Sequence, residues 1–244
     1  MQFSVQLYSV RDFLKDDLPG TIQRLAQIGY TQVEAYDFVA NVEALRAALR
    51  NNGLTAPSGQ ALLLDCDQDE AFAAAQAVGI DTVIEPYSPA KLWQNKDDVL
   101  EIAGKLNAAA TKGAEYGIRV GYHNHAWEPA SSFGDKSGLE FLADNLDPAV
   151  VLEVDTYWAA VGGQNPARLI DRLGDRVRFL HIKDGPITPD QAAQVPAGQG
   201  QMAVWDIIDA AKSLEFGVVE FDDYAGDLFD GVAQSLTYLR NGRV

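Results

Sequence analysis

Cysteine is almost absent from this sequence, and its scarcity limits the chemistry open to the protein. Cys66 is the only cysteine among 244 residues. A single thiol excludes an intramolecular disulfide framework and any zinc site built from cysteines. We therefore interpret Cys66 as an incidental thiol.

Long apolar runs and an excess of basic residues are also missing. No apolar run approaches the ~18 residues that span a bilayer. The first seven residues lack a charged segment followed by an apolar stretch, so they indicate a strand rather than a secretory signal, and we expect a cytoplasmic protein. With 35 acidic and 19 basic side chains, the net charge of −16 disfavours nucleic acid and anionic membranes as partners.

No low-complexity segment or Ser/Gly linker divides the chain, and no glycine-rich phosphate loop follows its first strand. The missing loop removes the main reason to expect a dinucleotide-binding fold. An apolar content of 47% and a charged content of 22% are ordinary for a globular protein, and the length suits one α/β barrel.

What recurs is a short β-rich run followed by an Ala/Leu-rich helical stretch. We predict strands at Phe3–Tyr8, Gln32–Ala35, Thr55–Gln60, Thr82–Pro86, Arg119–His123, Val150–Asp155, Val177–Lys183 and Gly217–Phe221. We predict helices at Leu18–Ile28, Val42–Asn51, Asp67–Val78, Lys96–Tyr116, Ser137–Asn145, Pro166–Leu173, Val204–Ser213 and Leu228–Asn241. This alternation fits a closed parallel barrel better than an open doubly wound sheet. The prediction is one (β/α)8 TIM barrel domain of the α/β class over residues 1–244.

Polar residues stand at the C-terminal ends of the later strands, where a barrel of this kind builds its active site. A spacing of two residues places side chains on one side of a strand. Such pairs occur in the four segments Gly121-Tyr122-His123-Asn124-His125, Leu152-Glu153-Val154-Asp155, Leu180-His181-Ile182-Lys183-Asp184 and Val219-Glu220-Phe221-Asp222.

All three histidines of the chain, His123, His125 and His181, fall at such strand ends. Asp155 and Glu220 supply acids on the strands that flank His181. A lone histidine at a strand end is more often structural than a ligand, but the coincidence of three favours a site. Imidazole and carboxylate groups that converge in this way predict one divalent ion, either Mn, Mg, Co or Zn.

At these residues the sequence resembles the xylose isomerase-like TIM barrel superfamily, in particular its sugar phosphate isomerase/epimerase family. The resemblance covers nearly the whole chain. The segments that carry it are Val5-Gln6-Leu7-Tyr8-Ser9-Val10-Arg11-Asp12, Gly29-Tyr30-Thr31-Gln32-Val33-Glu34, Gly121-Tyr122-His123-Asn124-His125, Glu153-Val154-Asp155-Thr156-Tyr157-Trp158 and His181-Ile182-Lys183-Asp184.

The resemblance implies a metal ion held by an acid, an Asp, a His and a second acid from strands five to eight. Asp155, His181 and Glu220 match the last three positions. At the first position this chain has His123 where many members have Glu, so His123, His125 or Glu128 completes the ligand set. At strand three, Gln60 replaces the histidine of a Ser-x-His pattern, which argues against proton transfer there.

The resemblance also implies catalytic and substrate-binding groups. Lys183 is the first candidate for a general acid/base or for a cation that stabilises an enolate, and His125 or Glu128 is the second. Glu153 lies deeper on the face of Asp155 and supports the site or meets substrate. Aromatic residues that either stack on a sugar face or belong to the core and rim are Tyr8, Trp93, Tyr157 and Trp158, and Gln60 is expected to contact the sugar.

Two enzymatic hypotheses follow for a small sugar or polyol substrate. The first is a sugar isomerase or epimerase that acts on a ketose or keto-sugar through an enediolate, with the metal as Lewis acid. The second is a lyase or dehydratase that acts on a keto-inositol or a 3-keto-glycoside. A non-catalytic sugar-binding barrel is a third reading. An endonuclease is disfavoured by the charge of −16 and the small number of histidines. A homo-oligomer is possible for this superfamily.

Overall fold

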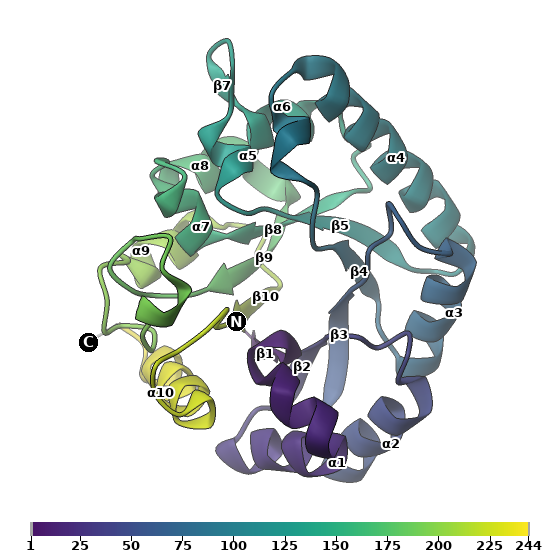
Figure 1. Cartoon of the computed structure of the whole chain (residues 1–244), viewed down its shortest axis with the longest axis vertical. Coiled ribbons are helices and arrows are strands. Elements are labelled where there is room, and N and C mark those ends of the chain that lie inside the picture. The colour runs from purple at the N-terminus through teal and green to yellow at the C-terminus, as the bar shows by residue number, and fades with distance from the viewer. Residues whose placement is uncertain (1, 244) are drawn as a thin grey trace.

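Eight parallel strands close into a barrel in the computed structural model, which describes residues 2–243 (Figure 1). Around the barrel the strands follow the order β1-β10-β9-β8-β5-β4-β3-β2. The predicted (β/α)8 barrel is confirmed. The strands are β1 (Gln2–Gln6), β2 (Gln32–Ala35), β3 (Thr55–Gln60), β4 (Thr82–Glu85), β5 (Arg119–His123), β8 (Val151–Asp155), β9 (Val177–Ile182) and β10 (Phe216–Val219).

Helices surround the strands in chain order, from α1 at the bottom of Figure 1 through α4 on the right to α10 at the lower left. Gly29 and Gly79 end α1 and α3 with φ of 112° and 92°, the left-handed conformation that a glycine adopts without strain. The outer helices are α1 (Arg11–Ile28), α2 (Val42–Asn52), α3 (Gln68–Val78), α4 (Lys96–Glu115), α6 (Gly138–Asn145), α8 (Pro166–Leu173), α9 (Val204–Ala210) and α10 (Leu228–Asn241).

The largest difference from the prediction lies at the first helix, and smaller ones lie at the first strand and at α9, which ends at Ala210 rather than Ser213. The predicted strand Phe3–Tyr8 is shorter, because the chain leaves β1 after Gln6 and forms a 3-10 helix, η1 (Leu7–Val10). The first helix begins at Arg11 rather than Leu18, with a non-helical residue, Asp17, between its two parts. The Asp17 carboxylate accepts a hydrogen bond from Gly20 N at 2.9 Å, so the predicted start coincides with this second part.

Short elements that the sequence did not reveal lie mostly in the loops that follow the strands. A hairpin of β6 (Ser132–Phe133) and β7 (Lys136–Ser137) projects at the top of Figure 1. The others are α5 (Trp127–Ala130), α7 (Thr156–Val161), and the 3-10 helices η2 (Ala90–Trp93), η3 (Gly174–Arg176) and η4 (Gln191–Ala193).

The barrel interior changes from apolar to charged along its axis. Near the N-terminal ends of the strands, Phe179 stacks on Phe216 with ring centroids 5.9 Å apart, and Val151 packs in the same cluster. Two and four residues after Val151 and Phe179, and four residues after Phe216, the same face carries ionisable side chains in place of apolar ones. The buried ionisable residues of the fold therefore gather at or just beyond the C-terminal ends of the strands. Within residues 2–243, no helix has both the length and the apolar character needed to cross a membrane.

Candidate active site

Strand alternation brings five of the predicted residues to one buried place. Glu153 and Asp155 lie on β8, His181 is on β9, and Lys183 and Glu220 directly follow β9 and β10. Their side chains are almost completely buried, with exposures between 0% and 5%. Ionisable groups at this depth require partners, because an unpaired buried charge is costly.

Asp155, His181 and Glu220 form a group that fits a divalent metal ion. One ligand atom from each lies within 4.8 Å of the other two. His181 Nδ1 is 2.5 Å from Glu220 Oε2, and Asp155 Oδ2 is 2.9 Å from the ammonium of Lys183. Neither contact has the angles of a hydrogen bond, so both atoms lack a hydrogen-bond partner within the described residues. Buried ligand atoms that converge in this way and make ion pairs but no hydrogen bonds suit a cation.

The other ring nitrogen of His181 is held by a residue to which the sequence reasoning gave no role. Glu34 Oε1, on β2, lies 2.8 Å from His181 Nε2. Gln6 and Ser58 each donate a hydrogen bond of 2.6 Å to the Glu34 carboxylate, which fixes it in place. A carboxylate that accepts one N–H of a histidine leaves the opposite nitrogen free for a metal. Glu34 therefore orients Nδ1 of His181 toward Asp155 and Glu220.

The titration of these groups reflects their burial and their mutual charges. Burial, together with the charge of Glu153, raises the pKa of Glu34 to about 7. Burial opposes the charge on His181, but Glu153 and Glu220 outweigh it and raise the pKa of His181 well above its usual value. Burial also opposes ionisation of Glu220, yet His181 and Lys183 bring the pKa of Glu220 well below its usual value. Metal binding at His181 Nδ1 would displace a proton.

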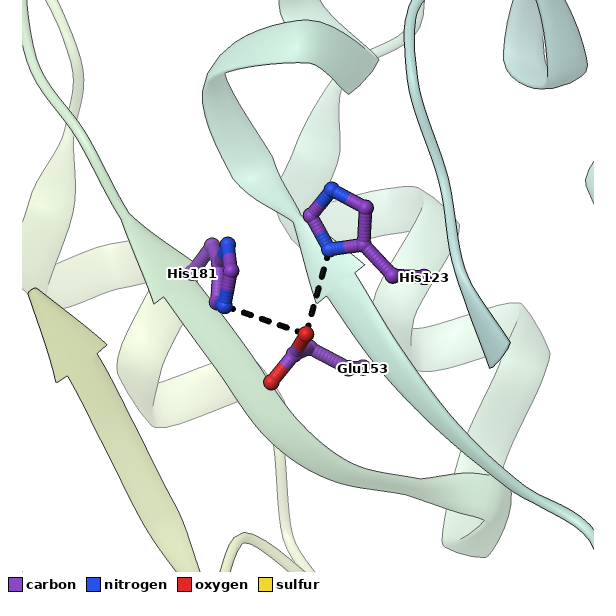
Figure 2. Close-up of side chains that lie close together, drawn as sticks. All are labelled: His123, Glu153 and His181. Carbon is purple, nitrogen blue, oxygen red and sulfur yellow. Dashed lines mark hydrogen bonds and ion pairs between the residues drawn. The ribbon is translucent and has the colours of Figure 1, made fainter. Parts of the chain in front are cut away.

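Figure 2 shows how Glu153 joins two of the histidines. Its Oε2 atom lies 3.2 Å from His123 Nδ1 and 3.0 Å from His181 Nε2, and it accepts a hydrogen bond of 3.0 Å from Gln60. His123 Nε2 is then the free nitrogen, 4.0 Å from Asp155 Oδ2. Burial and the two other histidines lower the pKa of His123 to about 3, which keeps its imidazole neutral.

Lys183 is held as a cation by three carboxylates. Its ammonium lies 2.9 Å from Asp155, 2.7 Å from Glu220 and 2.7 Å from Asp222. Burial alone would lower the pKa of Lys183, but these carboxylates raise it well above its usual value. A lysine in this state supplies positive charge or a proton rather than acting as a base.

His125 and Glu128 occupy different positions although they were predicted as alternatives. Glu128 is buried, accepts hydrogen bonds of 2.9 Å from Tyr122 OH and from the backbone N–H of His125, and is outside the lining of the cavity described below. The His125 ring is stacked on Trp127 with centroids 4.5 Å apart and planes 4° apart. Glu128 and Trp127 thus position His125 at the cavity.

Asp222 lies at the mouth of the barrel and has three side-chain partners. Its Oδ2 atom accepts hydrogen bonds from Lys183 at 2.7 Å, Trp158 Nε1 at 3.1 Å and Gln194 at 2.6 Å. Gln194 in turn accepts a bond of 2.9 Å from the Asp222 backbone N–H. Sequence reasoning gave Asp222 no role, although its spacing of two from Glu220 is the signal that marked the other pairs.

Three of the aromatic residues predicted to contact sugar, Trp93, Tyr157 and Trp158, lie outside the cavity lining. Tyr157 is buried, and its hydroxyl bonds the backbone N–H and C=O of Thr188 at 3.1 Å, which anchors the loop after β9. Trp93 is also buried and donates a hydrogen bond of 2.7 Å to Ser88. Asp184 supports the same loop as Tyr157, because its carboxylate accepts four backbone N–H bonds of 2.8–3.0 Å.

A cavity of about 550 Å³ opens above these residues at the C-terminal ends of the strands. Its volume is within the range of small-molecule sites. The predicted residues that line it are Tyr8, Gln60, His123, His125 and Glu220, whereas Glu153, Asp155, Trp158, His181 and Lys183 lie outside its lining, among the buried groups described above.

The fold and this site define the class of the protein. A family model described as xylose isomerase-like TIM barrel matches residues 22–241, which is most of the chain. The chain belongs to this family.

Curated relatives match over shorter stretches. The chain is 34% identical over 80 residues to the inosose dehydratase of Geobacillus kaustophilus, a match that covers 32% of this chain and 25% of that protein. It is 32% identical over 101 residues to the inosose dehydratase of Lactiplantibacillus plantarum, covering 41% and 31%. These matches span less than a third of either relative.

Solved structures resemble the chain over its whole length. A sugar phosphate isomerase/epimerase from Parabacteroides distasonis superposes with a TM-score of 0.81 at 24% identity, covering 99% of this chain and 94% of that one. The probable 3-DHS dehydratase AsbF of Bacillus anthracis gives a TM-score of 0.76 at 14% identity and covers both chains fully. The IOLI protein, solved with a bound zinc atom, gives 0.72 at 12% identity, covering 97% and 96%. At these identities the likeness establishes the shared fold.

Proposed function

We propose that the chain is a divalent-metal-dependent lyase. It removes a proton next to the ketone of a keto-polyol or keto-sugar and expels an oxygen substituent from the β-carbon as water or an alcohol. One observation carries the proposal. Asp155 Oδ2 and His181 Nδ1 are buried without hydrogen-bond partners, they converge with Glu220, and Glu34 fixes the opposite nitrogen of His181.

The ligands that we assign to the ion are His123, Asp155, His181 and Glu220. His123 takes the first position rather than His125 or Glu128, because Glu153 holds its Nδ1 and its Nε2 lies toward Asp155. Two imidazoles and two carboxylates suit Mn, Co or Zn better than Mg, which prefers an all-oxygen shell. When bound, the ion supplies Lewis-acid polarisation of the ketone.

His125 is the group that we assign to proton transfer. It lines the cavity, and Glu128 and Trp127 fix its backbone and ring. Its imidazole takes the proton from the carbon next to the ketone and returns it to the departing oxygen, so one residue serves both halves of the elimination. The positive charge of Lys183, whose ammonium is held by three carboxylates beside the ligand group, favours the negative charge that develops on the ketone oxygen without a direct hydrogen bond to it.

Elimination is preferred to isomerisation because the curated relatives are named inosose dehydratases. This choice reverses the order of the two hypotheses from the sequence. Both reactions begin with the same proton removal, and isomerisation differs only in returning the proton to carbon.

Product NMR in heavy water tests the proposal. The Mn-loaded protein is incubated with inosose, a free ketohexose and a methyl 3-ketoglucoside. Loss of water or methanol supports the lyase, and deuterium retained on carbon without loss supports the isomerase instead. If neither occurs and Asp155→Asn behaves like the unmodified protein, the chain is a sugar-binding barrel. Cys66→Ser is the control, since Cys66 is an exposed residue of the cavity lining that belongs to neither candidate ligand group.

A further inference from the structure

The cavity has a wall that the proposed chemistry does not use. After β2, β3 and β4 the chain contributes a set of apolar and aromatic side chains, here called the loop wall: Tyr36, Phe38, Val39, Leu62, Pro86 and Tyr87. The volume of about 550 Å³ leaves space beside a single sugar ring for a second group of similar size. The loop wall borders that additional space.

Two side chains of the loop wall are exposed although they are large and apolar. Leu62 is 48% exposed and Tyr87 is 46% exposed. Within residues 2–243 the other large hydrophobic residues exposed to this extent are Phe13 and Leu100. An exposed apolar surface next to a cavity is typical of a ligand-binding wall.

The loop wall is held in position before any ligand arrives. The buried carboxylate of Glu85 accepts a hydrogen bond of 2.8 Å from Leu64 N and one of 3.1 Å from Tyr87 N. It thereby ties the loop after β3 to the loop after β4. The Tyr87 ring also packs edge-on against His125, with centroids 5.5 Å apart, and against Trp127, at 5.7 Å. A fixed apolar surface loses little entropy when it binds a ligand.

Apart from the proposed metal ion, the side chains of the cavity disfavour a phosphate group. The cavity's described lining contains no lysine or arginine but includes five carboxylates: Asp37, Asp67, Glu70, Glu220 and Asp222. The nearby cations are already engaged. Lys183 contacts three carboxylates, and Arg11 donates hydrogen bonds of 3.0 Å to the backbone carbonyls of Tyr8 and Asp222. Charged donors that are free to reach the oxygens make the strongest phosphate contacts, and the described lining offers no such side chain.

We propose that the substrate is an uncharged keto-sugar or keto-polyol that carries an apolar, ring-sized substituent, and that it is not a sugar phosphate. This inference rests on the proposed function, because the ketone must lie at the metal ligands. The substituent then packs on the loop wall, as the aromatic or aliphatic alcohol of a glycoside would.

Binding to the Mn-loaded protein tests this assignment without turnover. The probes are methyl glucoside, phenyl glucoside, both as their two anomers, and glucose 6-phosphate, measured by titration calorimetry. We expect phenyl glucoside to bind about tenfold tighter than methyl glucoside, as burial of part of an aromatic ring predicts. Glucose 6-phosphate should bind more weakly than either glycoside. Equal affinity of the two glycosides, tighter binding of the phosphate, or no saturable binding of either glycoside would overturn the proposal.

A pair of exposed leucines provides a matched control. Leu62→Ser should reduce the ratio of phenyl to methyl affinity to about threefold or less, since it removes apolar surface from the loop wall. Leu100→Ser changes a leucine of similar exposure on α4, outside the cavity, and should leave both affinities unchanged. An equal loss of the ratio in both variants would contradict the assignment.

The substrate-class proposal and the lyase proposal are refuted by different results. If the protein exchanges solvent deuterium into a keto-sugar but gains no affinity from the phenyl group, the substrate class is wrong and the chemistry stands. If the phenyl preference and its dependence on Leu62 hold while no keto-sugar exchanges or reacts, the loop wall is a binding surface and the lyase assignment is wrong.

Discussion

Replacement of Glu34 by Gln should weaken metal binding without removing a ligand. Glu34 lies 2.8 Å from His181 Nε2 and is fully buried. Glutamine has nearly the same volume, and the Ser58 hydroxyl, which now donates to Glu34, is able to rotate and accept from the new amide. The fold should therefore tolerate the change, while His181 loses the nearer of the two carboxylates beside its Nε2.

Loss of a carboxylate behind a metal-bound histidine typically costs about 10- to 100-fold in metal affinity, or about 1.4–2.7 kcal/mol. We expect the dissociation constant for Zn or Mn to rise by this factor in Glu34→Gln. The assay is competition with a chromophoric chelator at a fixed pH, because metal binding displaces a proton from the site.

Glu85→Gln is the matched control for this experiment. Glu85 is also a fully buried carboxylate at the end of a barrel strand, and burial raises its pKa to about 7 as well. It accepts bonds from backbone N–H groups and not from a histidine. Glu85→Gln should leave metal affinity unchanged. Unchanged affinity in Glu34→Gln, or an equal decrease in both variants, would refute the role given to Glu34.

Three further predictions follow from the same geometry. Burial raises the pKa of Glu85 to about 7, so the folded state binds this proton more tightly than the unfolded state does. The free energy of unfolding should therefore fall by at most about 3 kcal/mol as pH rises from about 4.5 to 7. Urea unfolding of the metal-free protein measures this fall, which should be shallower in Glu85→Gln. Asp184→Asn should lower the free energy of unfolding by about 2–3 kcal/mol and increase hydrogen exchange in the loop of residues 185–203. Unchanged protection of this loop would contradict the role of the four backbone bonds to the Asp184 carboxylate. His125→Asn should lower kcat by about 10²–10⁴ with metal affinity intact, whereas His123→Asn should lower metal affinity; the reverse pattern would exchange their roles.

The barrel was predictable because its signal is local. Most strands are short apolar or β-rich runs, and most helices have a recognisable start or stop residue, so the order of elements could be read without any knowledge of tertiary contacts. The first helix is the element whose start the sequence did not predict. The segment from Arg11 has no apolar face strong enough to predict, and only the tertiary structure joins it to the helix that begins at Leu18.

The sequence predicted which candidate ligands would gather at the strand ends, but not the residues that support them. Asp155, His181 and Glu220 stand at strand ends, where a carboxylate or imidazole is conspicuous in a buried strand. Glu34 stands at an equivalent place on β2, yet its partner His181 is 147 residues away in the sequence. A hydrogen bond across the barrel depends on register and depth, which a strand pattern does not contain.

The pair His123 and His125 shows that a spacing of two residues predicts side-chain direction only within a strand. Alternation fixes the direction of a side chain only while the backbone stays in the strand ladder. Glu153 and Asp155 both lie within β8, and both are buried in the barrel. β5 ends at His123, so the direction of His125 is set by Glu128 and Trp127 instead. One histidine thus lies beside Asp155 and the other in the cavity wall against Trp127. A reaction that binds a metal and moves a proton needs these two positions to be distinct, because an imidazole whose free nitrogen holds the ion is unable to accept a proton there.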